Sequence, residues 1–211
     1  MEHSRAPSTY DDPLPPAFYP VSLNLVGRRC VVIGDDQEAH EKTAALREVQ
    51  ADVRVVPDPA MLHDHELSDV FFVISTPQDA ALSARLRALA DIHRFLLCTI
   101  DQPTYGFVAM QAIVQAGPAR IGISTGGVAP RVGKKLKWAL MRVFDAKFTQ
   151  FLDCLATQKL RNRYRLADKP QERRAAMIAA AEGFEVDIAF RYPTWFEQRQ
   201  AEQLPSLSGE S

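Results

Sequence analysis

The stretch Cys30–Val56, CVVIGDDQEAHEKTAALREVQADVRVV, decides the fold that the sequence predicts. An apolar run over 30–33 ends at Gly34 and indicates a buried strand, and apolar residues recur at helical spacing over 37–49. A second apolar run follows at 52–56. A strand, a helix and a strand within ~30 residues are typical of a parallel, right-handed βαβ unit. The sequence therefore predicts the start of a nucleotide-binding sheet.

Two further apolar runs continue this alternation. Residues 70–74 and 95–100 have the length of fully buried strands, and a helix rich in Ala and Leu is predicted between them at 79–90. Alternating strands and helices are typical of a doubly wound α/β sheet. The predicted fold class is therefore α/β, with a Rossmann-like parallel sheet in the first half of the chain.

The pattern changes after this sheet. Residues 107–114 and 119–124 are predicted to form two strands, joined through a turn at Gly117 and Pro118. Only helices are expected beyond them, which indicates a second domain. The predicted helices run from Pro130 through Trp138 to Leu155, over 171–181, and past the FRYPTWF segment near the end.

The charge of the chain is unevenly distributed. The 211 residues are 46% hydrophobic, which favours a folded protein over a disordered one, and the net charge is only −1. Residues 131–174, however, carry 13 Lys and Arg against 4 Asp and Glu. Such a block suits nucleic acid, an acidic membrane surface or a polyanionic small molecule, and a solvated helical face is an equally good explanation.

The cysteines and the ends of the chain indicate in which cellular compartment the protein is expected. Cys30, Cys98 and Cys154 lie in apolar runs without metal-ligand spacing, so they are predicted to be buried thiols in a reducing compartment. No apolar run reaches the ~18 residues of a membrane span, and the first residues lack a signal region. The sequence thus predicts a cytoplasmic protein without a membrane partner. Flexible segments are predicted at 1–18 and 205–211.

Asp101 is the first candidate for chemistry. It follows the predicted strand over 95–100, and open α/β sheets bind ligands at the carboxyl ends of their strands. A carboxylate in that position is placed to exchange protons with a ligand. The alternative is that Asp101 only caps a turn or a helix.

A Ser-Thr-Gly-Gly turn at 124–127 is the second candidate. It is followed by Pro130 and by Arg131, Lys134, Lys135 and Lys137, so it is predicted to open a basic helix. Free amides at a helix start, approached closely through two glycines, suit carboxylates or phosphates. A plain chain reversal is the alternative.

The loop Gly34-Asp35-Asp36-Gln37-Glu38-Ala39 stands where a dinucleotide-binding loop would lie. It keeps the first glycine and the final small residue of G-x-G-x-x-G/A, but Asp36 replaces the central glycine. Carboxylates have the wrong charge for a pyrophosphate, so an ordinary turn capped by an Asp is the competing interpretation. Asp58, after the second strand, either meets a ribose or belongs to its own turn.

Two other features carry no predicted site. His63 and His65 lie in a polar segment without a third ligand, so no metal site is predicted there. The basic segment KLRNRYR at 159–165 could contact nucleic acid, but no nucleic-acid motif accompanies it. We therefore expect no nucleic-acid partner.

Five segments together resemble the precorrin-2 dehydrogenase / sirohydrochlorin ferrochelatase family, which is also the N-terminal module of siroheme synthases. They are YPVSLNL before the first strand, VVIG with its loop, IST at 74–76, CTID at 98–101, and AIVQAGPARIGISTGGVAP at 112–130. The resemblance covers roughly residues 19–145 well. The segment ISTGG-x-x-P is its most specific part.

The resemblance implies an architecture and an activity. It implies a homodimer in which a Rossmann-like NAD-binding domain (19–111) precedes a small dimerisation and tetrapyrrole-binding region (112–147) and an α-helical C-terminal domain (148–204). It implies oxidation of precorrin-2 to sirohydrochlorin with NAD in siroheme synthesis, and in some members insertion of Fe²⁺. The substrate would be a tetrapyrrole with eight carboxylates, which offers a partner for the basic block.

The resemblance also implies roles for individual residues. Asp101 matches the catalytic aspartate of the family, and one positioned carboxylate could serve as base in both reactions. The implied cofactor-binding residues are Gly34, Asp36, Gln37, Glu38, Asp58, Pro59 and Thr76. The implied substrate-binding residues are Ser124, Thr125, Gly126, Gly127 and Lys134.

The chain departs from the family in its loop, where Asp35 and Asp36 replace two of three glycines. Weakened NAD binding is therefore predicted. Two hypotheses follow from the sequence. One is an NAD-dependent dehydrogenase, and the other is a tetrapyrrole-binding or chelating homologue that has lost dehydrogenase activity.

Overall fold

The structure is a computed structural model that describes residues 18–203. The chain divides into two compact units within one helix, the first ending at Leu152 and the second beginning at Asp153. The predictions for residues 1–17 and 205–211 lie outside the described residues.

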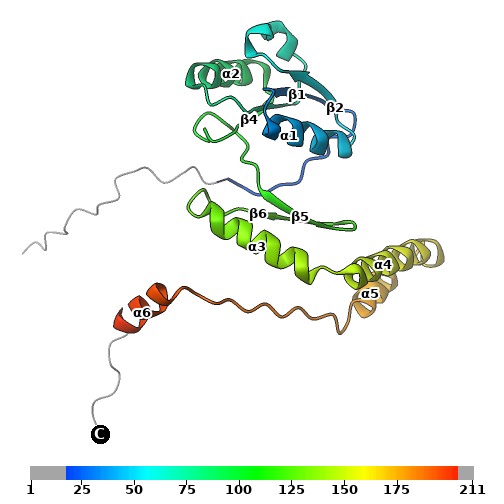
Figure 1. The fold of residues 1–211 in the computed structure, drawn as a ribbon. Coiled ribbons are helices and arrows are strands. Elements are labelled where there is room, and N and C mark those ends of the chain that lie inside the picture. Colours follow the sequence, from blue (N-terminus) through cyan, green and yellow to red (C-terminus); the bar gives the residue numbers. More distant parts are fainter. Residues whose placement is uncertain (1–17, 204–211) are drawn as a thin grey trace, which may run out of the picture. The chain divides into compact units, whose positions relative to one another are not determined.

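The first unit contains a parallel sheet of four strands (Figure 1). Strand β1 (Arg29–Ile33) lies between β2 (Asp52–Val56) and β3 (Phe72–Ser75), and β4 (Leu96–Thr99) pairs with the far side of β3. The chain thus moves from β1 to one neighbour and then crosses to the other. Such a reversal of strand order opens a crevice at the carboxyl ends of the strands, where ligands bind in this class of fold.

Two helices cover the two faces of this sheet. Helix α1 (Gln37–Glu48) contributes Ala39 and Leu46 to a cluster that includes Val32 and Ile74, and α2 (Ala80–His93) contributes Leu82 and Leu86 to a cluster that includes Val31 and Ile33. Successive residues of β1 therefore alternate between the two cores, as the period of a strand requires. The predicted Rossmann-like α/β fold is confirmed.

An antiparallel hairpin follows the sheet. Strands β5 (Ala112–Ala116) and β6 (Ala119–Ile123) turn at Gly117, which has the positive φ of +56° that favours glycine. The predicted strand over 107–114 is wrong in its first half. The amides of Phe107 and Val108 both donate to the carbonyl of Leu97, at 2.7 and 3.0 Å, so this part of the chain is tied to the sheet instead.

The predicted helix from Pro130 to Leu155 is two helices, α3 (Pro130–Val143) and α4 (Ala146–Arg165). They are separated at Asp145, whose Oδ1 accepts a hydrogen bond of 2.8 Å from the amide of Phe148. A side chain that satisfies the free amide of a new first turn favours a fresh helix start. The remaining helices are α5 (Pro170–Ala180) and α6 (Thr194–Gln203). None of the helices in the described part of the chain is long and apolar enough to cross a membrane.

The cysteines differ in their surroundings. Cys30 and Cys98 are buried, as predicted, and burial raises the pKa of each thiol to about 11. Both are therefore protonated and unreactive at neutral pH. The prediction for Cys154 is wrong, because this residue is exposed on α4, a helix without any buried residue.

Candidate functional site

The crevice between β1 and β3 brings Gly34 and Thr76 together. Gly34 has a φ of +124°, and a Cβ at this position would overlap the hydroxyl of Thr76. The amide of Thr76 donates to the carbonyl of Ile33 at 3.0 Å, and the hydroxyl oxygen of Thr76 lies 3.3 Å from the same carbonyl oxygen. Glycine is therefore required at position 34 for two reasons: its backbone has a positive φ, and the side chain of Thr76 approaches it closely.

Asp36 occupies the amino end of α1. Its Oδ1 accepts a hydrogen bond of 2.8 Å from the amide of Ala39, and its Oδ2 accepts one of 2.5 Å from the hydroxyl of Thr76. These two hydrogen bonds, that of Thr76 first, hold the pKa of Asp36 below its ordinary value of 3.8. Asp36 is therefore ionised at neutral pH, and any stabilisation it provides is lost only as the pH falls below about 3.8. The carboxylate lies where a helix of this fold would receive a phosphate.

The other acidic residues of the loop are directed elsewhere. Glu38 pairs with Lys42 one turn along α1, at 3.1 Å, and Asp35 lies 3.7 Å from a ring nitrogen of His40. Gln37 donates to Glu41 at 3.0 Å. The sequence predicts carboxylates near the position of a pyrophosphate, whereas in the structure only Asp36 accepts hydrogen bonds at the amino end of α1.

Asp58 follows β2 and is engaged within its own turn. Its Oδ1 accepts a hydrogen bond of 2.9 Å from the amide of Ala60, and Pro59 begins the short 3₁₀ helix η1 (Pro59–Met61). This is the capping role that the sequence left open as the alternative. A ribose would have to share this carboxylate with the turn.

Asp101 lies at the carboxyl edge of the sheet, two residues after β4. The amide of Ile100 donates to the carbonyl of Ser75 at 2.9 Å and so continues the pairing of β4 with β3 up to this point. The side-chain amide of Gln78, in the loop after β3, donates to Oδ2 of Asp101 at 3.0 Å. Asp101 has a φ of +57°, a conformation that Asp and Asn tolerate better than most residues.

Sequence reasoning did not identify Gln78. The available signal was its position, three residues after the end of a buried parallel strand and therefore at the same edge as Asp101. The contact itself joins residues 23 positions apart and depends on the pairing of β3 with β4.

The Ser124–Gly127 turn lies between β6 and α3. Gly126 and Gly127 have φ of +60° and +77°, and the amide of Gly126 donates to the hydroxyl of Ser124 at 3.2 Å. Two successive left-handed residues are not helical, so the glycine turn precedes the helix, and α3 begins at Pro130, where the sequence predicts it. The space around a Cβ at Gly126 is open, which leaves its backbone accessible to a ligand.

The turn is nevertheless held close to the first turn of α3. A Cβ at the buried Gly133 would lie 3.6 Å from Cγ2 of Thr125. Lys134 and Lys135 follow Gly133 directly and are exposed. The structure thus brings a glycine turn and two cationic side chains into one neighbourhood.

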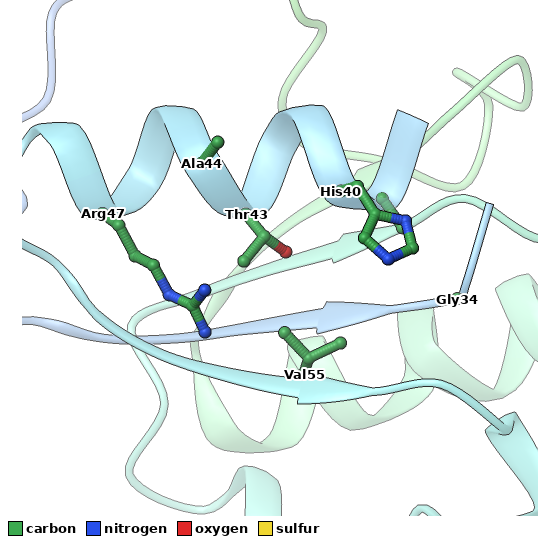
Figure 2. A pocket seen from close by; sticks show the side chains of 7 residues that line it. Gly34, His40, Thr43, Ala44, Arg47 and Val55 are labelled. Atoms are coloured by element: carbon green, nitrogen blue, oxygen red, sulfur yellow. The ribbon is translucent and has the colours of Figure 1, made fainter. Parts of the chain in front are cut away.

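A groove of about 190 Å³ lies between α1 and β2. Figure 2 shows His40, Thr43 and Arg47 directed from α1 toward the strands, with Val55 opposite them. The groove includes Gly34 but neither Asp101 nor Thr76, and its other lining residues belong to α1 and β2. Of the predicted cofactor-binding residues, only Gly34 lines this groove.

No cluster of three His, Cys, Asp or Glu side chains that could hold a metal ion occurs in the part of the chain that the structure describes. Other contacts account for the local structure around His63 and His65. Glu66 pairs with Arg54 at 2.6 Å and accepts from the amide of His63 at 3.0 Å, which closes the short 3₁₀ helix η2 (Asp64–Leu67).

Comparison with known proteins matches the sheet to a family. A family model described as "Putative NAD(P)-binding" matches residues 21–112. The siroheme synthase of Hahella chejuensis is 25% identical over 82% of this chain and 41% of its own length. Those of Xylella fastidiosa and Nitrosococcus oceani are 26% and 25% identical, over 70% and 57% of this chain and 36% and 30% of their own lengths.

The solved structure of SirC, a precorrin-2 dehydrogenase, has the same fold. It superposes with a TM-score of 0.61 over 79% of this chain and 90% of SirC, at 19% sequence identity. The chain spans well under half the length of the siroheme synthases it matches. These matches agree with the resemblance found in the sequence motifs: the sheet matches an NAD(P)-binding family model, and the chain is similar to siroheme synthases and has the fold of a precorrin-2 dehydrogenase.

Proposed function

We propose that the protein acts in siroheme biosynthesis and oxidises precorrin-2 to sirohydrochlorin with NAD. The observation that carries the proposal is the position of Asp101, held by Gln78 at the carboxyl edge of a sheet that matches an NAD(P)-binding family. A dinucleotide would supply a hydride acceptor beside this edge. The substrate would give up a hydride to the nicotinamide and a proton to the carboxylate of Asp101, so that atoms and charge balance.

The residues of the crevice fit a dinucleotide in part. Gly34 allows close approach to the backbone, and the amino end of α1 provides amides for a pyrophosphate. Asp36 opposes binding, because its carboxylate already accepts the amide of Ala39. NAD binding therefore requires Asp36 to leave that amide or to share it, which supports the expectation of weak affinity.

The proposal is tested by incubating the purified protein with precorrin-2 and NAD. We expect NADH and sirohydrochlorin to form in equal amounts. The two products absorb in different bands, so absorption spectroscopy measures each of them. A macrocycle that binds but is not oxidised at saturating NAD would contradict the dehydrogenase assignment.

That outcome would favour the second candidate, a tetrapyrrole-binding or chelating homologue without dehydrogenase activity. The specific observation behind it is the occupation of the α1 amino end by Asp36. In a chelatase, Asp101 would accept the protons that leave the pyrrole nitrogens as Fe²⁺ enters as a substrate. Fe²⁺-dependent loss of the metal-free spectrum in the absence of NAD separates this activity from oxidation.

We propose that the Ser124–Gly127 turn and α3 bind the carboxylates of the macrocycle. Replacing Lys134 and Lys135 by Glu is expected to weaken sirohydrochlorin binding, because two attractive charges become repulsive next to the turn. The difference from the native protein should shrink as salt is added. Fluorescence titration at several salt concentrations measures both effects.

The matched control places the same charge change farther along the chain. Arg142 in the last turn of α3 and Lys147 at the start of α4 are both exposed. Their replacement by Glu should weaken binding much less. Equal losses in the two double variants would mean that only net charge matters, and the assignment of the turn would then be wrong.

We also propose that the protein is a homodimer, in line with the family. The observation behind this is the exposure of several large apolar side chains on α3, among them Val132, Trp138 and Met141. Light scattering at micromolar concentration should give twice the mass of the chain. The mass of a single chain would contradict it.

A further inference from the structure

The second unit contains a groove that the proposed reaction does not use. It lies between α4 and α5 and has a volume of about 300 Å³. Asn162 on α4 approaches the sulfur of Met177 on α5 at 3.8 Å, which indicates that the helices are in contact along the groove. Its lining residues are Lys159, Arg163, Pro170, Arg173, Arg174 and Met177.

The charge of this groove is not balanced within the described part of the chain. Residues 159–174 carry seven Lys and Arg against two Asp and Glu, and one of the two acids, Glu172, already pairs with Lys169 at 3.0 Å. Between residues 18 and 203 the structure records no ion pair or side-chain hydrogen bond for Lys159, Arg163 or Arg174. Three cations thus line one groove without an anion.

Helix stability explains only part of this arrangement. Basic residues near the carboxyl end of α4 interact favourably with the helix dipole, which accounts for Arg163. Arg173 and Arg174 lie in the first half of α5, nearer its amino end, where a positive charge does not interact favourably with the helix dipole. Arg173 is held in place by donating to the carbonyls of Leu166 and Ala167, at 3.3 and 3.2 Å. Arg174 has no comparable structural role.

We propose that this groove binds a small molecule carrying two or more carboxylate or phosphate groups. Guanidinium groups recognise both kinds of anion through paired hydrogen bonds. A volume near 300 Å³ is at the lower end for ligand pockets and suits a compact anion. A nucleic acid fits less well, because no aromatic ring lines the groove to stack on a base, and the exposed Tyr164 lies outside the lining. The inference is independent of the proposed function.

The test is calorimetry on the full chain with two compact probes, pyrophosphate and citrate, at low salt. Binding of pyrophosphate alone would assign the groove to phosphates, and binding of citrate alone to carboxylates. Replacing Arg163 and Arg174 together by Gln should weaken binding at least tenfold, because glutamine keeps the helix propensity but removes both charges. Circular dichroism establishes that the helices remain. Lys159→Gln provides a second, milder variant with a smaller expected loss.

The matched control replaces Arg161 and Arg165 by Gln. These residues lie on the same helix and are exposed, but they do not line the groove. Binding should be nearly unchanged in this variant. The inference is overturned if neither probe binds at millimolar concentration, or if the control loses as much affinity as the groove variant. It is equally overturned if a short RNA binds more tightly than both probes and both double variants lose it alike.

Discussion

Replacing Asp101 by Asn is expected to lower the turnover of precorrin-2 by about 10²–10⁴-fold, the usual contribution of a positioned general base. Asn keeps the shape of the side chain and can still accept the hydrogen bond from Gln78. It also tolerates the φ of +57° found at this position, so the fold should be unaffected. Initial rates of NADH formation, compared with thermal unfolding of the same samples, measure the effect.

Alanine is a poorer choice at this position, because a left-handed backbone costs most residues roughly 1–2 kcal/mol. Gln78→Ala provides the informative companion. It leaves the carboxylate of Asp101 in place but removes the group that orients it, so we expect a smaller loss of turnover than for Asp101→Asn. If Asp101→Asn kept more than a tenth of the native activity, Asp101 would not be the base.

The sheet could be predicted from the sequence because its signals are local. The predicted bounds of β2, 52–56, are the observed ones, since an apolar run between two turns leaves few alternatives. Asp101 was placed correctly for the same reason, as it directly follows such a run. A residue at the end of a strand can be placed as soon as the strand itself has been predicted.

The errors arose where the outcome depends on distant partners. Cys154 lies in an apolar pattern, but whether a helical face is buried depends on what packs against it, and α4 has no buried residue. The break before α4 is a local exception: it depends on whether the side chain of Asp145 accepts a hydrogen bond from the amide of Phe148, which composition does not reveal. The hydrogen bond between Asp36 and Thr76 joins residues 40 positions apart.

That hydrogen bond changes the expectation for the glycine-poor loop. From the sequence, Asp35 and Asp36 were expected to oppose a pyrophosphate together. The structure distinguishes them by their contacts, because Asp35 lies beside His40, whereas Asp36 accepts hydrogen bonds from the amide of Ala39 and the hydroxyl of Thr76. Asp36 should therefore account for most of the loss in NAD affinity.

Replacing Asp35 and Asp36 together by Gly is expected to tighten NAD binding at least tenfold. Removing the carboxylate takes away a negative charge near the pyrophosphate and frees the amide of Ala39, which should raise the affinity for NAD roughly tenfold to a hundredfold. Glycine is an acceptable helix cap, so the loss of the Asp36 cap should lower the stability of the fold only slightly. Calorimetric titration with NAD measures the affinity.

Single variants separate the contributions of Asp35 and Asp36 to the affinity for NAD. Asp36→Gly should give nearly the full gain and Asp35→Gly almost none, since only Asp36 is bound to the helix end. Asp36→Ser keeps an oxygen that can cap the Ala39 amide but removes the charge, so an intermediate gain would separate charge from capping. Tight NAD binding by the native protein, with no gain in the double variant, would mean that the dinucleotide avoids the end of α1, and the electrostatic argument would then be wrong.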